Sequence, residues 1–75
     1  MNAMMAVSNH GRTIHSIDPK RPKADLLRQS GGTSAQRAFR DTEAGDAEHI
    51  GYVVSHGRGT EPEWFTFYTV DRWVR

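Results

Sequence analysis

This 75-residue chain contains no cysteine, which excludes disulfide bonds, thiolate metal ligands and a cysteine nucleophile. Its apolar runs all fall short of the roughly 18 residues that a membrane-spanning helix needs. The segment Met1–Val7 lacks the basic flank and the length of a secretory signal. We therefore expect a soluble cytoplasmic protein with no membrane partner. A chain of this size supports a single core, so residues 1–75 are expected to form one small domain.

The sequence also lacks the spaced motifs of metal and phosphate sites, with no HExxH, GxxxxGK or GxGxxG pattern. The best catalytic group is His56 as general base with Arg58 and Glu61 in a glycine-containing loop, an arrangement that a small histidine-dependent ribonuclease could use. Polar residues beside loop glycines are more often simply solvated. We predict no metal, no cofactor and no enzymatic activity, with the ribonuclease kept as an alternative. The four histidines are too dispersed to chelate one ion: His10, His15, His49 and His56.

Charge is divided unequally along the chain. Residues 1–40 carry seven basic and two acidic side chains, a balance of +5, whereas residues 41–75 carry three and seven, a balance of −4. Opposite halves can neutralise each other or form two differently solvated faces. The alternative is a basic patch that contacts phosphate or an acidic protein. Its candidate residues are Lys20, Arg21, Lys23, Arg28, Arg37 and Arg40.

The first elements are expected to be a short hairpin. Met4–Ser8 and Arg12–Ile17 have strand character, and the turn residues Asn9–Gly11 lie between them. Ile14 and Ile17 would lie on opposite faces of a regular strand, which weakens the pattern. A frayed N-terminus is the alternative interpretation.

Two short helices are predicted next. The proline-containing connector Asp18–Lys23 leads into good helix formers over residues 22–29, because proline is accepted in a first helical turn. Thr33–Gln36 then matches the capping-box pattern, in which the threonine hydroxyl accepts from an amide three residues on. This pattern predicts a helix over residues 34–43, ended by Gly45.

The C-terminal part is predicted to be an aromatic hairpin with strands at about 48–56 and 63–70. The loop His56–Pro62 between them contains two glycines and a proline, and six of the seven aromatic residues lie in this hairpin and its C-terminal flank. The predicted fold is therefore α+β, a small antiparallel sheet with one or two short helices on one face. A second core-forming layer on the other face is not expected.

Alternation in the final strand places Trp64 and Tyr68 on one side and Phe65 and Phe67 on the other. Because two slender helices can cover only one face, some aromatic surface should remain accessible. Trp64 and Tyr68 could instead shield the sheet edge. If exposed, they could stack bases or pack against a protein, including a second copy of this chain. Nearby carboxylates disfavour a phosphate path: Glu48, Glu61, Glu63 and Asp71.

In its general features the chain is similar to small single-domain inhibitors of phages and mobile elements, especially anti-CRISPR proteins. The shared features are a cysteine-free helix pair (Lys23–Glu43), the aromatic hairpin (Ile50–Val70), segregated charge and no catalytic set. This resemblance implies a protein that occupies a CRISPR effector and blocks DNA binding or nuclease recruitment. We predict a non-enzymatic module that docks on a protein of a nucleic-acid-handling complex. Direct RNA or DNA binding and homodimerisation remain alternatives. The predicted partner-binding residues are Lys20, Arg21, Lys23, Arg28, Arg37, Arg40, Arg58, Trp64 and Tyr68.

Overall fold

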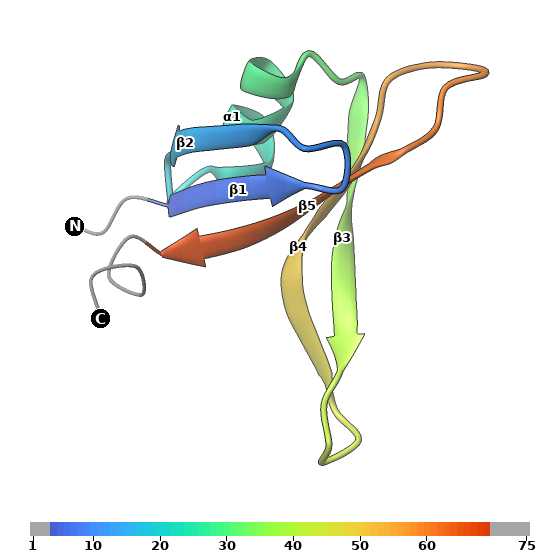
Figure 1. Ribbon diagram of the computed structural model, residues 1–75. Helices are drawn as coiled ribbons and strands as arrows, with labels where there is room; N and C mark the ends of the chain where they lie inside the picture. The colour runs from blue at the N-terminus through green and yellow to red at the C-terminus, as the bar shows by residue number, and fades with distance from the viewer. Residues whose placement is uncertain (1–3, 70–75) are drawn as a thin grey trace.

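The computed structural model describes residues 4–69, which fold into a five-stranded antiparallel sheet with one short helix (Figure 1). The predicted α+β class is confirmed. The last strand inserts between the two hairpins, because the strand order is β2-β1-β5-β4-β3. No helix among the described residues is long and apolar enough to cross a membrane. The elements are β1 (Met4–Ser8), β2 (Thr13–Ile17), α1 (Pro22–Ser30), β3 (Ser34–Asp41), β4 (Ala47–Ser55) and β5 (Glu63–Thr69).

The predicted N-terminal hairpin is confirmed, with β1 and β2 paired antiparallel. Ser8 stabilises its turn twice. The Ser8 amide donates to the carbonyl of Arg12, and its hydroxyl oxygen accepts from the amides of His10 and Arg12. Gly11 lies in the turn with φ of 82°, a left-handed conformation that glycine adopts without a steric penalty.

A bulge in β2 corrects the expectation that its two isoleucines lie on opposite faces. Ile17 lies opposite Met4 and Ile14 opposite Ala6, so β2 has one residue more than β1 over this span. An extra residue resets the alternation of side chains. Ile14 and Ile17 therefore both enter the core, where they pack in one cluster with Ala6.

The helix predicted at residues 22–29 is confirmed as α1. Pro22 lies in its first turn, where a missing amide hydrogen costs nothing. Gly31 ends the helix in a left-handed conformation, and its amide donates to the carbonyl of Leu27 at 3.1 Å. Leu26 is fully buried, so α1 covers one face of the sheet next to β2 and β3.

The second helix, predicted at residues 34–43, is wrong: this segment is the strand β3. Thr33 does not cap a helix, because its amide and its hydroxyl both donate to the carbonyl oxygen of Ser55, at 2.8 and 3.1 Å. These bonds hold Thr33 beside Ser55, the last residue of β4, so that β3 lies next to β4 from its first residue. From there pairing continues along all of β3, with Ala35 opposite Val54 in the core.

The physical reason is that the same residues satisfy two periodicities. Ala35 and Phe39 are four residues apart. They would share one side of a helix, which repeats about every four residues, and they also share one side of a strand, which repeats every two. A side-chain cap contributes only about 1 kcal/mol, whereas pairing with β4 satisfies the backbone of a whole strand. Gly45 is then a turn residue with φ of 88°, and the amide of Thr42 donates to the carbonyl of Asp46 across that turn.

The C-terminal hairpin predicted at 48–56 and 63–70 is confirmed, and residue 70 lies outside the described residues. β4 and β5 pair only where Gly51–Val54 lie opposite Glu63–Thr66. Beyond that point the β3–β4 hairpin diverges from β5, which continues beside β1 (Figure 1). The sheet is therefore forked.

The two faces of the sheet differ because α1 covers only one of them. Phe65, on the covered face, is 1% exposed, whereas the adjacent Trp64 is 49% exposed. The alternation predicted for this strand is thus confirmed. On the other face, which we call the open face, the central strands present Met5, Val7, Val53, Trp64, Thr66 and Tyr68.

Candidate functional site

Four aromatic rings form a continuous row across β3, β4 and β5 on the helix-covered face. We call Phe39, His49, Tyr52 and Phe67 the ring row. Successive ring centroids lie 5.5, 5.1 and 5.5 Å apart, with tilted or edge-to-face geometry. Tyr52 is buried in the core, but Phe39 is 51% exposed. The row therefore leads from the core beneath α1 out to solvent.

A bulge in β4 makes this row possible. His49 and Tyr52 are three residues apart, so in a regular strand they would point to opposite faces. Ala38 lies opposite Gly51 and Phe39 opposite His49, which leaves Ile50 as the extra residue. The Nε2 atom of His49 is 2.9 Å from the carbonyl oxygen of Gly51, which holds the imidazole beside the bulge.

Basic side chains border the exposed part of the ring row. A groove of about 590 Å³ is lined by Lys23 and Arg37 together with Phe39, His49 and Tyr52. Lys23 comes from the first turn of α1, and Arg37 lies directly opposite Tyr52 in the β3–β4 register. The helix and the second hairpin thus each contribute a cation beside the rings.

A second hollow of about 470 Å³ continues from this groove. It is lined by Lys20, Arg21 and Lys23 with Leu27 and Tyr52, so the two hollows share Lys23 and Tyr52. We call the combined surface the basic groove, and Lys20, Arg21, Lys23 and Arg37 the groove cations. Within residues 4–69 no groove cation forms a salt bridge.

The other predicted cations are separated from the basic groove or already neutralised. Arg28 forms a salt bridge with Asp25 one turn earlier in α1, and Arg40 contacts Glu48 at 2.9 Å. Arg58 is exposed in the loop between β4 and β5. Of the seven basic residues in the predicted binding set, the structure brings together only the four groove cations.

The open face carries the two predicted aromatic contacts. Trp64 is half-exposed and lies opposite Val53, whereas Tyr68 is partly buried and lies opposite Met5. Val7 lies opposite Thr66 between these two pairs. Over the segments where β1, β5 and β4 pair with one another, this described face has no charged side chain.

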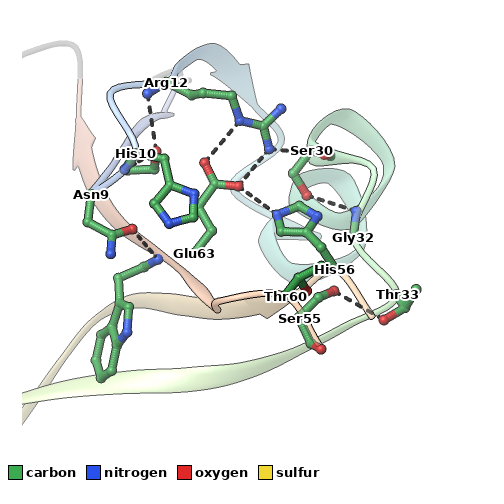
Figure 2. Close-up of polar contacts among 12 residues, drawn as sticks. Asn9, His10, Arg12, Ser30, Gly32, Thr33, Ser55, His56, Thr60 and Glu63 are labelled. Atoms are coloured by element: carbon green, nitrogen blue, oxygen red, sulfur yellow. Dashed lines mark hydrogen bonds and ion pairs between the residues drawn. The ribbon is translucent and has the colours of Figure 1, made fainter. Parts of the chain in front are cut away.

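Glu63 is a buried carboxylate that joins four parts of the fold (Figure 2). Its oxygens accept from Arg12 Nε at 2.9 Å and from Arg12 Nη2 at 2.7 Å, a bidentate pair. His56 Nε2 lies 2.7 Å from Oε1, and the Ser8 hydroxyl also bonds to the carboxylate. Arg12 Nη2 reaches further to the carbonyl of Ser30 at the end of α1.

The hydrogen-bond donors around Glu63 keep its carboxylate ionised. Hydrogen bonding from Arg12 is the main cause that lowers the pKa of Glu63 to about 2, against the opposing effect of burial. The same contact raises the pKa of the Arg12 guanidinium. A general base works best with a pKa near the operating pH. Glu63 is therefore suited to linking the hairpin turn, the helix end and the β4–β5 loop, and poorly suited to proton transfer.

The candidate catalytic group of His56, Arg58 and Glu61 does not form a contact network among the described residues. His56 contacts Glu63 instead, and both Arg58 and Glu61 are exposed. A signal for Glu63 was present in the sequence, because it is in phase with Phe65 on the side of β5 that becomes buried. A carboxylate at such a position needs a hydrogen-bonding partner of opposite charge, and Arg12 supplies it from 51 residues away.

Among residues 4–69, no three His, Asp or Glu side chains are placed to hold a metal ion. Comparisons of this chain with protein-family models, with curated proteins and with solved structures find no match. The basic groove and the open face are therefore interpreted from their own geometry.

Proposed function

We propose that this protein is a non-enzymatic binding module that docks on another protein through its open face. The single observation that carries the proposal is Trp64, half-exposed beside Val53 on the part of the open face that has no charged side chain among the described residues. An antiparallel sheet with one covered face usually presents polar side chains on the other. Here that second face is largely apolar.

The composition of the open face is that of a protein interface. Trp64 and Tyr68 are residue types that dominate binding energy, because they bury a large area with few rotatable bonds. Thr13 lies opposite Val7 at one side of the face and Gln36 opposite Val53 at the other, and both polar residues are exposed. An apolar centre with a polar rim is the usual anatomy of an interface.

The expected contribution of Trp64 can be estimated. Trp64 is 49% exposed, so a partner that covers it removes about 120 Å² from water, worth about 3 kcal/mol at 25 cal/mol per Å². Truncation to alanine should therefore weaken binding by at least about tenfold.

The proposed partner is a protein of a nucleic-acid-handling complex, with CRISPR effectors as the first class to test. The resemblance of the sequence to anti-CRISPR inhibitors supports this choice. A second support is the basic groove on the opposite face, which would place positive charge beside nucleic acid held by such a partner.

The test compares three purified proteins: wild type, Trp64→Ala and Phe39→Ala. Phe39 is the matched control, because it and Trp64 are the large hydrophobic residues exposed among the described residues and they lie on opposite faces. Each protein is titrated by biolayer interferometry against CRISPR effector proteins prepared without guide RNA or DNA, so that the basic groove, which contains Phe39, cannot contribute through nucleic acid. Each is also used for capture from nuclease-treated bacterial lysate, followed by titration of the purified captured protein.

We expect Trp64→Ala to weaken binding and Phe39→Ala to leave it unchanged, with circular dichroism confirming that both variants fold. Equal binding by wild type and Trp64→Ala would contradict the proposal. Capture of lysate proteins that is lost whenever nucleic acid is digested would also contradict the proposal. A concentration-dependent mass in sedimentation that Trp64→Ala abolishes would identify a second copy of the chain as the occupant and replace the hetero-partner.

A further inference from the structure

We infer that the basic groove is a binding site for single-stranded nucleic acid, separate from the open face. The ligand is recognised by two chemical features together, a phosphate backbone and unpaired bases. The groove cations and the exposed end of the ring row provide the complementary groups within one continuous surface.

The electrostatic argument begins with charge that is not used inside the protein. The four groove cations form no salt bridge within residues 4–69, whereas Arg28 and Arg40 do. The carboxylates next to Arg21 are occupied locally. Asp25 accepts from Arg28 and from the amide of Asp18, and Asp18 accepts from the amide of Lys20. The carboxylate of Asp18 keeps its negative charge, because a backbone amide does not neutralise it, but the four groove cations outnumber it. A polyanion entering the groove therefore meets a net positive charge.

The ring row adds the second feature. Phe39 is 51% exposed and His49 is also exposed, so π surfaces stand beside Arg37 and Lys23. Bases stack on aromatic side chains with little sequence preference, because every base has a π face. Only unpaired bases offer these faces, so the geometry favours a single strand over a duplex. Glu48, expected from the sequence to repel phosphate, is paired with Arg40.

The location of the site explains why its two components are found together. Lys20, Arg21 and Lys23 approach from the start of α1, and Arg37 and Phe39 from β3. β3 runs alongside β4, whose bulge turns His49 towards the same face as Tyr52. Only the packing of α1 on the sheet places the cations next to the rings.

Salt dependence gives a quantitative expectation. For single strands, log K falls with log salt with a slope of about −0.7 for each phosphate contact, so four contacts predict a slope of about −3. Between about 50 and 200 mM salt the affinity should then fall roughly 50-fold. Removal of one groove cation should reduce the slope by about 0.7.

The experiment measures fluorescence anisotropy of labelled oligo-dT and oligo-U of about 12 nucleotides, within the site size of small single-strand binders. A duplex of equal length and unlabelled polyglutamate are the comparison ligands. The oligo-dT and oligo-U arms distinguish DNA from RNA. The proteins are wild type, Arg37→Ala, Lys23→Ala/Arg37→Ala, Phe39→Ala, and the two controls Arg58→Ala and Trp64→Ala.

We expect Arg37→Ala and the double variant to weaken binding and to flatten the salt slope stepwise. Phe39→Ala should weaken binding about tenfold or more with the slope unchanged, because stacking carries no charge. Arg58→Ala removes the same charge outside the groove and should leave both quantities near the wild-type values. Trp64→Ala should bind oligonucleotide normally, which separates this inference from the proposed protein docking.

Three results would overturn the inference. One is no binding of either oligonucleotide by wild type at low salt. Another is equal loss in Arg58→Ala and Arg37→Ala, which would indicate a response to net charge alone. The third is displacement by polyglutamate as efficient as by oligonucleotide together with unchanged affinity in Phe39→Ala, which would identify a general polyanion surface.

Discussion

Replacing Glu63 with glutamine should destabilise the protein by about 2 kcal/mol at neutral pH. The ionised Glu63 carboxylate has its pKa lowered from 4.5 to about 2. At 1.36 kcal/mol per pKa unit this difference corresponds to at most about 3 kcal/mol of folding free energy. Arg12, its main partner, is 45% exposed, so solvent screening reduces the expected value to about 2 kcal/mol.

The sign of the pH dependence follows from the direction of the shift. Because the folded-state pKa of Glu63 is lower than its unfolded value of 4.5, its contribution is complete above that pH. The contribution is lost as the pH falls towards 2, and a little over half of it should be gone near pH 3. The pKa of Asp25 is also lowered, mainly by hydrogen bonding from Arg28, and adds a loss in the same direction. The Asp25 contribution is present in both proteins and cancels in their difference.

The assay is urea unfolding followed by circular dichroism, for wild type and Glu63→Gln, at neutral pH and near pH 3. Between neutral pH and pH 3, the free energy of unfolding of wild type should fall by about 1 kcal/mol more than that of Glu63→Gln. A variant within about 0.5 kcal/mol of wild type at neutral pH, or equal acid losses in both proteins, would refute the reasoning.

A core this small rarely supplies more than roughly 3–5 kcal/mol, so Glu63→Gln could be unfolded even at neutral pH. Two further measurements then decide the question. The first is the acid titration of wild type, which should still lose stability between pH 4.5 and 2. The second is His56→Ala, which removes one hydrogen bond and should destabilise by about 1 kcal/mol. No acid loss in wild type would contradict the role of Glu63.

Three further substitutions test the packing by the same urea assay. Gly51→Ala should cost about 3 kcal/mol or lose the fold, because its Cβ would lie 1.8 Å from the carbonyl oxygen of Phe65; a cost below about 1 kcal/mol would contradict this close approach. Leu26→Ala should cost about 2–4 kcal/mol, because Leu26 is the fully buried apolar residue of α1. Arg28→Ala should cost less than about 0.5 kcal/mol, because Arg28 is largely exposed and its pair with Asp25 is screened; a larger cost would show that this pair is structural.

Local chemistry was sufficient to predict several elements. Pro22 lies in the first turn of α1, a role that depends only on its own backbone preference. The turns at Asn9–Gly11 and after His56 separate strands that the structure confirms. Alternation in β5 correctly placed Phe65 and Trp64 on opposite sides of the strand. In each case the relevant interaction spans only a few residues.

Three features could not be assigned by such arguments. Residues 34–41 satisfy both helical and strand spacing, and the neighbouring β4 determined the outcome. The bulges at β2 and near Ile50 shift the alternation by one residue, which places His49 beside Tyr52. Neither bulge has a glycine or proline signature at the extra residue.

The sequence by itself determined the α+β class, the helix α1, two hairpin turns and the division of β5 into two sides, because each depends on propensity or spacing within one segment. Tertiary structure decided where β3 pairs, which cations meet the ring row, and that Arg12 neutralises Glu63 across 51 positions of the chain. The physical reason is that a buried charge, a bulge or a shared groove gains its free energy only when distant segments are already in contact. Both candidate binding surfaces, the open face and the basic groove, are products of that assembly.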